Sequence, residues 1–109
     1  MAKLSKSALR QLLKGGETTT VELKIVAPRP IEMAERLCGM ANRQGGMIII
    51  GVEDAEHKIV GVPDERMAMT VDTILRAARQ NIKLALDPPE PEVSVLDGKQ
   101  VVGCYSTIE

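Results

Sequence analysis

Residues 47–52, MIIIGV, constrain the fold most, because they form an apolar run that follows a pair of glycines and contains a third near its end. A run of this length is typical of a strand whose two faces are both covered by other elements. Gly45 and Gly46 precede the run, and Gly51 interrupts its end. We therefore predict a central buried strand with a helix stop before it. At Gly51 we expect either a close approach of a neighbouring element or a bulge.

The periodicity of apolar residues predicts a mixed domain around this strand. Helical spacing recurs in three segments, which are 5–16, 31–42 and 63–83. Alternating or short apolar runs predict strands, which are 17–26, 47–52, 58–62, 92–96 and 101–106. Asp64 is the predicted N-cap of the third helix. The order α, β, α, β, β, α, β, β indicates an α/β fold of the α+β type, with a mixed, mostly antiparallel sheet packed with helices.

The composition excludes some functions and suggests a compartment. Tyr105 is the only aromatic residue among 109, so an aromatic platform for stacking unpaired bases is not expected. Cys38 and Cys104 lack the spacing of a zinc site, and we expect both to be small core residues in a reducing compartment. The sequence has no 18-residue apolar stretch and no signal-peptide pattern. A cytoplasmic protein without a membrane partner is therefore expected.

Positive charge is concentrated in the first part of the chain. Residues 1–45 carry eight Lys or Arg against four Glu, whereas residues 46–109 carry six against eleven acidic residues. Four of the basic residues follow the first predicted strand and the next helix, and they are Lys24, Arg29, Arg36 and Arg43. Such residues can contact the phosphates of DNA or RNA, or they can simply keep a charged helix face in solvent. Composition does not separate these two interpretations.

Two kinds of catalysis do not fit the sequence. A phosphate-binding P-loop needs a strand, a Gly-rich loop and then a helix, but here the helix comes before the glycines and the strand after them. The glycines therefore follow a helix C-terminus, where the helix dipole repels phosphate. His57 is the only histidine and is expected to be exposed in a polar turn, so Ser/His or Cys/His catalysis is not expected.

Three carboxylates form a candidate metal site. Glu17 precedes the first predicted strand, Glu22 lies on its polar side, and Asp54 follows the central strand. If the two strands are neighbours, the three acids can meet near one end of the sheet and bind a divalent metal for phosphodiester cleavage. The alternative is that Glu22 forms an ordinary exposed ion pair with Lys24.

Four sequence motifs occur in an order that matches a known family. They are ETTTVELK (17–24), ANRQGGMIIIGVED (41–54), IVGV (59–62) and VSVLDGKQVV (93–102). Their combination resembles the AlbA-2 domain of Schlafen proteins, which many bacterial proteins described as transcriptional regulators share. The pattern joins E-x4-E-x-K to A-N-x-x-G-G and I-G-V-x-D. The resemblance extends from about residue 17 to residue 106, which is most of the chain.

The resemblance implies an Alba-like two-layer sandwich that binds nucleic acid, with DNA expected for bacterial members. In the nuclease members, two glutamates and an aspartate form a metal-dependent RNA-cleaving site, and they match Glu17, Glu22 and Asp54 here. Mg²⁺ or Mn²⁺ is needed only under that hypothesis. Leu23 stands where the family usually has Phe, and the family helix usually has a Phe near Met40; both changes keep apolar volume.

Three functional hypotheses follow from the residues and the resemblance. The first is a non-catalytic DNA-binding module of a transcriptional regulator, which requires no cofactor and binds as a homodimer. The second is a metal-dependent nuclease, and the third is a dimerisation module for a missing C-terminal domain. For the domain organisation, we predict a single domain, with an N-terminal helix at 1–16 and an AlbA-2-like domain at 17–109. The chain is expected to be the N-terminal part of a longer protein.

Overall fold

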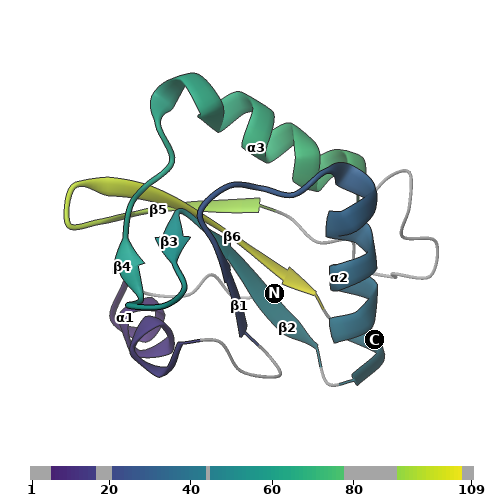
Figure 1. The fold of residues 1–109 in the computed structure, drawn as a ribbon, viewed down its shortest axis with the longest axis horizontal. Helices are drawn as coiled ribbons and strands as arrows, with labels where there is room; N and C mark the ends of the chain where they lie inside the picture. The colour runs from purple at the N-terminus through teal and green to yellow at the C-terminus, as the bar shows by residue number, and fades with distance from the viewer. Residues whose placement is uncertain (1–5, 17–20, 44, 78–90, 107–109) are drawn as a thin grey trace.

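The computed structural model describes residues 6–16, 21–43, 45–77 and 91–106 (Figure 1). Its main sheet has the strand order β1-β2-β6-β5, with bounds Val21–Lys24, Gly46–Ile50, Lys99–Ser106 and Pro91–Leu96. A separate hairpin contains β3 (Val52–Glu53) and β4 (Lys58–Ile59). The described helices are α1 (Lys6–Gly15), α2 (Pro30–Arg43) and α3 (Asp64–Arg76). β1 and β2 are parallel and joined through α2, and the other pairs are antiparallel. The predicted α+β class with a mostly antiparallel sheet is confirmed.

The central strand β2 is covered on both faces, as its sequence predicts. All five residues of β2 are buried. Ile48 and Ile50 belong to the core that the sheet shares with α2 and α3. Met47 and Ile49 belong to a second core on the opposite face, where α1 packs. Alternate side chains of a strand point to opposite faces, so one continuous apolar run supplies both cores.

Helix α1 is part of the packed structure. Leu9 and Leu13 are one helical turn apart and each is 5% exposed. Both belong to the same core cluster as Val21 and Leu23 of β1. Leu23 of β1 and Met40 of α2 are both buried. Helical cover therefore exists on both faces of the sheet, with α2 and α3 on one and α1 on the other (Figure 1).

Gly45, which lies between α2 and β2, ends the helix as predicted. Gly45 has a φ of 85°, and its N–H donates to the carbonyl of Met40 over 2.8 Å. This bond closes the kind of helix terminus that a glycine in a left-handed conformation favours.

Gly51 is a point of close approach, one of the two alternatives predicted for it. Its φ is 105°, and its N–H donates to the Lys24 carbonyl over 2.7 Å. Its own carbonyl accepts hydrogen bonds from Val60 and Gly61 over 2.9 and 2.8 Å. The chain therefore leaves the main sheet at this residue and enters the β3–β4 hairpin.

Several predicted boundaries were wrong. β1 ends at Lys24, and Ile25 and Val26 are 49% and 53% exposed instead of continuing the strand. The reason is that β2 turns away at Gly51, which leaves no neighbouring strand for them. β4 is shorter than the predicted strand at 58–62 for the same kind of reason, because its partner β3 has two residues.

The start of α3 also differs from the prediction. Asp64 is not the N-cap, because Pro63 occupies that position and makes no side-chain cap hydrogen bond. Asp64 is instead the first helical residue, where its negative charge favours the helix dipole. The predicted end of this helix near residue 83 lies outside the described residues. Within the described parts of the chain, no helix is long and apolar enough to cross a membrane.

The two cysteines are expected to differ in reactivity. Cys104 is buried, and this burial raises the pKa of its thiol to about 12, whereas Cys38 is half-buried. In a Cys38→Ser variant, iodoacetamide at about pH 8 should modify Cys104 only after unfolding, because the thiolate is the nucleophile. A Cys104→Ala variant, which keeps only Cys38, is the control. Alkylation of native Cys104 at the rate of an unfolded thiol would contradict its burial.

The same pKa shift predicts a pH dependence of stability. The thiol of Cys104 ionises near 9.0 when the chain is unfolded and near 12 when it is folded. The contribution of this thiol to the free energy of unfolding is therefore fully present below pH 9 and decreases as the pH rises from 9 towards 12.

Candidate nucleic-acid interface

Glu22 brings two of the predicted basic residues together at the β1 edge of the sheet. Its carboxylate accepts a hydrogen bond from Arg36 Nη1 over 2.7 Å. Lys24 Nζ lies 3.8 Å from the same Oε2 atom. Glu22 is 19% exposed, whereas Lys24 and Arg36 are 33% and 38% exposed. A half-buried anion thus holds two cations that remain accessible to solvent.

This arrangement follows from the pattern of β1 and from the packing of α2. Val21 and Leu23 point into the core under α1, so Glu22 and Lys24 point to the opposite face, which α2 covers. Leu37 of α2 is buried in that core, and the preceding residue, Arg36, is left at the side of the helix. An Arg guanidinium carries five N–H donors, so a bond to Glu22 leaves others for a phosphate oxygen.

Of the other two predicted basic residues, only Arg29 has a described side chain, and it pairs outside this cluster. Arg29 is 80% exposed and forms an ion pair with Glu32 over 2.8 Å. This pair lies at the start of α2 and has the ordinary three-residue spacing of a surface helix pair. Arg43 is the last residue of α2, and its side chain lies outside what the structure describes.

The predicted acidic site is described only in part. Glu17 lies outside the described residues, Glu22 contacts two cations, and Asp54 is exposed in the β3–β4 turn. Among the residues that the structure describes, no group of three metal-ligating side chains occurs. The metal-binding role of Glu17, Glu22 and Asp54 stays a prediction.

Glu53 rather than Asp54 organises the β3–β4 turn. Its carboxylate accepts hydrogen bonds from the N–H groups of Ala55 and Glu56, each over 2.9 Å. These bonds satisfy backbone donors in the turn, so Glu53 has a local structural role.

His57 is not the exposed residue that its polar neighbours predict. It has a φ of 57° and is half-buried. Its imidazole packs so closely on Gly16 that a methyl group there would overlap the ring. The contact joins the β3–β4 turn to the end of α1, and sequence periodicity cannot reveal it because the two residues are 41 positions apart.

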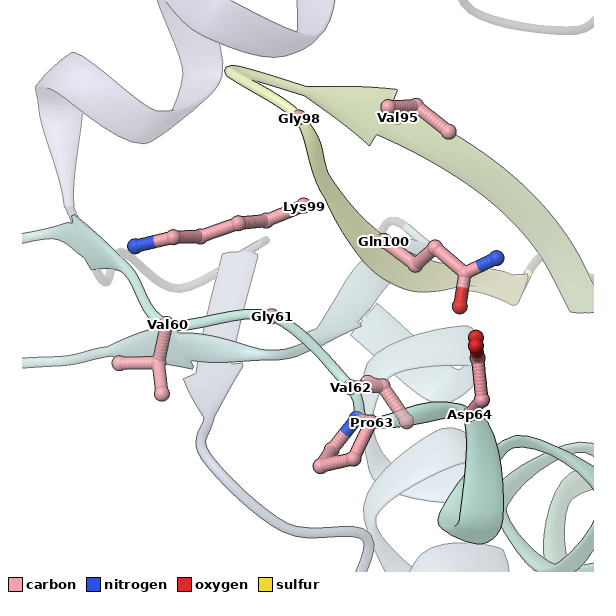
Figure 2. A pocket seen from close by; sticks show the side chains of 9 residues that line it. All are labelled: Val60, Gly61, Val62, Pro63, Asp64, Val95, Gly98, Lys99 and Gln100. Atoms are coloured by element: carbon pink, nitrogen blue, oxygen red, sulfur yellow. The ribbon is translucent and has the colours of Figure 1, made fainter.

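The structure also contains a hollow that the sequence did not predict. About 540 Å³ lies between the segment from β4 to α3 and the β5–β6 hairpin. Figure 2 shows the side chains of Asp64 and Gln100 pointing towards one another there. Gln100 Oε1 is buried and has no hydrogen-bond partner within the described residues. Beside the hollow, the Val62 N–H donates to the Gln100 carbonyl over 2.6 Å, which joins two segments that are distant in the sequence.

Comparisons with solved structures agree with this fold. The DIP2311 protein from Corynebacterium diphtheriae aligns with a TM-score of 0.62 and 18% identity, over 94% of this chain and 22% of that one. A second structure is the N-terminal domain of a Nitrosomonas europaea protein described as related to the ATP-dependent DNA helicase RecG. It aligns with a TM-score of 0.58 and 20% identity, over 97% of this chain and 74% of that one. At these identities the likeness concerns the fold alone.

A comparison with curated proteins finds no match. A family profile, in contrast, matches the sequence over most of its length. The family described as Schlafen, AlbA_2 matches residues 17–105, which include β1, α2, the β2–β3 segment and both strands of the last hairpin. The chain therefore belongs to the Schlafen AlbA_2 family.

Proposed function

We propose that the chain is the DNA-binding module of a transcriptional regulator and holds the phosphate backbone at the β1 edge. The observation that carries the proposal is the cluster in which Glu22 holds Lys24 and Arg36 side by side. Arg29 and Arg43 are proposed to extend this surface along α2. Membership of the AlbA_2 family and the fold shared with a RecG-related protein support a nucleic-acid role.

The cluster suits phosphate contact better than base recognition. Lys24 comes from a strand and Arg36 from a helix, so their positions are fixed by two packed elements and not by one flexible loop. Cations positioned in this way contact phosphate oxygens and set orientation, but they do not read sequence. The affinity should therefore depend strongly on salt and weakly on sequence.

Duplex DNA is the proposed ligand. Single-strand binders combine a basic groove with aromatic rings on which bases stack, and this chain has one aromatic residue. The homodimer belongs to the same proposal, and light scattering should give the mass of two chains.

A charge-neutralised variant tests the surface. Lys24→Ala with Arg36→Ala should weaken binding to a labelled duplex about tenfold or more at about 0.1 M salt, measured by fluorescence anisotropy. The control, Arg76→Ala with Lys99→Ala, removes the same charge from α3 and β6 and should bind like the wild type. Unchanged affinity in the first variant, or an equal loss in the control, would remove this surface from the proposal.

The nuclease hypothesis is tested in the same preparation. Duplex DNA and tRNA are incubated with Mn²⁺ and either the wild-type chain or an Asp54→Ala variant. The non-catalytic proposal expects the same products from both proteins and little effect of Mg²⁺ or Mn²⁺ on affinity. Metal-dependent cleavage that disappears in Asp54→Ala would instead establish the nuclease.

A further inference from the structure

Helix α1 carries a row of positive charge that the family match does not include. Lys6, Arg10 and Lys14 recur at four-residue intervals, and the helix contains no acidic residue. All three side chains are exposed. The family profile begins at residue 17, after the end of this helix. The row is called the α1 basic stripe below.

The α1 basic stripe is held on a rigid support. A helix rises about 1.5 Å per residue, so successive cations lie about 6 Å apart along the axis and the stripe is about 12 Å long. Leu9 and Leu13 fix the helix to the sheet. The Arg10–Asp97 pair, at 3.0 Å, connects it to the β5–β6 turn. Lys6 and Lys14 have no ion pair within the part of the chain that the structure describes.

A hollow of about 400 Å³ lies beside the stripe, between α1 and the β3–β4 hairpin. Its lining residues are Arg10, Leu13, Lys14, Glu56, His57 and Ile59. Two cations thus face one carboxylate, and the contact of His57 with Gly16 holds the hairpin beside the helix end. The hollow therefore places N–H donors of Arg10 and Lys14 where a phosphate oxygen can reach them.

We infer that the α1 basic stripe and this hollow form a second phosphate-binding surface for a nucleic-acid duplex. The inference rests on the proposed function for its ligand, but it uses a helix on the other face of the sheet. A row of charges along one side of a packed helix suits the regular backbone of a duplex, which presents one charge per about 1.7 Å of its axis. A length of duplex equal to the 12 Å stripe therefore contains about seven phosphates.

The test is a variant that removes Lys6 and Lys14, the two stripe cations for which the described residues show no ion pair. Lys6→Gln with Lys14→Gln keeps the Arg10–Asp97 pair, and Gln has a helix propensity similar to that of Lys. Binding to a 20-base-pair DNA duplex (about two helical turns) is followed by anisotropy over a range of salt concentrations. The plot of log affinity against log salt should become shallower by about 2, since each lost phosphate contact removes about 0.9 to 1.

The control variant is Arg66→Gln with Arg76→Gln, which removes two positive charges from α3 on the opposite face. It should keep the wild-type slope, and circular dichroism should show that all variants are folded. An unchanged slope for Lys6→Gln with Lys14→Gln, or an equal change in the control, would overturn the inference. If that happens while Lys24→Ala with Arg36→Ala still weakens binding, the proposed function survives. A wild-type chain that binds no duplex would overturn both.

Discussion

Replacing Gly51 with alanine is expected to lower the free energy of unfolding by about 3 kcal/mol. Two costs combine in this estimate, and each is of order 1 to 3 kcal/mol. The backbone at Gly51 has a φ of 105°, which an L-residue adopts only with strain. An added Cβ would also lie 3.2 Å from Cγ2 of Val62 and 3.3 Å from the Gln100 carbonyl oxygen. The first atom is on a buried side chain and the second is backbone, so neither can move away freely.

Gly98→Ala separates the two costs. Gly98 has a φ of 75°, but a Cβ there would meet nothing within 4 Å. This control should lose only the conformational part, about 1 to 2 kcal/mol. Urea denaturation of the wild type and both variants measures the difference. Equal losses for Gly51→Ala and Gly98→Ala would show that the chain does not cross closely at Gly51.

Leu13→Ala should destabilise the whole domain by about 2 to 5 kcal/mol. The side chain is 5% exposed and belongs to the core that α1 shares with β1 and β2. Leu12 is the matched control, because it is the same residue type in the same helix but only partly buried against that core. Leu12→Ala should therefore lower the free energy of unfolding clearly less. Urea denaturation measures both losses, and each variant should unfold in a single transition.

The same urea measurement shows whether the helix predicted at 1–16 and the domain predicted at 17–109 unfold together. A separate N-terminal helix would detach without affecting the rest, so Leu13→Ala and Leu12→Ala would both leave the main transition unchanged. The packing of Leu13 beside Val21 and Leu23 leads us to expect the opposite result.

Local patterns were sufficient to predict the elements near the middle of the chain. Glycines 45 and 46 predicted the end of α2, and the apolar run at 47–52 predicted a strand buried on both faces. Both signals act between neighbouring residues, through the positive φ that glycine permits and through the alternation of a strand. The exposure of Ile25 and Val26 could not be predicted, because it depends on where β2 turns away from β1.

For the candidate site, the sequence was sufficient to identify the residues but not their contacts. The sequence marks Lys24 and Arg36 as basic residues, but it does not show that one carboxylate holds them together. That contact needs the parallel pairing of β1 with β2 and the packing of α2 over it. From the sequence, Glu22 is a candidate metal ligand or the partner of Lys24, and the structure adds Arg36 as its closer partner. The α1 basic stripe has a clear four-residue spacing, but its position beside the β3–β4 hairpin appears only in the fold.

The salt dependence of duplex binding by the unmodified chain tests the central proposal most directly. Anisotropy of a labelled DNA duplex, measured from about 0.05 to 0.2 M salt, gives the slope of log affinity against log salt. Phosphate contacts by Lys24 and Arg36 alone should give a slope of about −2, and further contacts should make it steeper. The slope should be the same for duplexes of unrelated sequence. Absence of duplex binding at the lowest salt concentration, or an affinity that does not change with salt, would contradict the proposal.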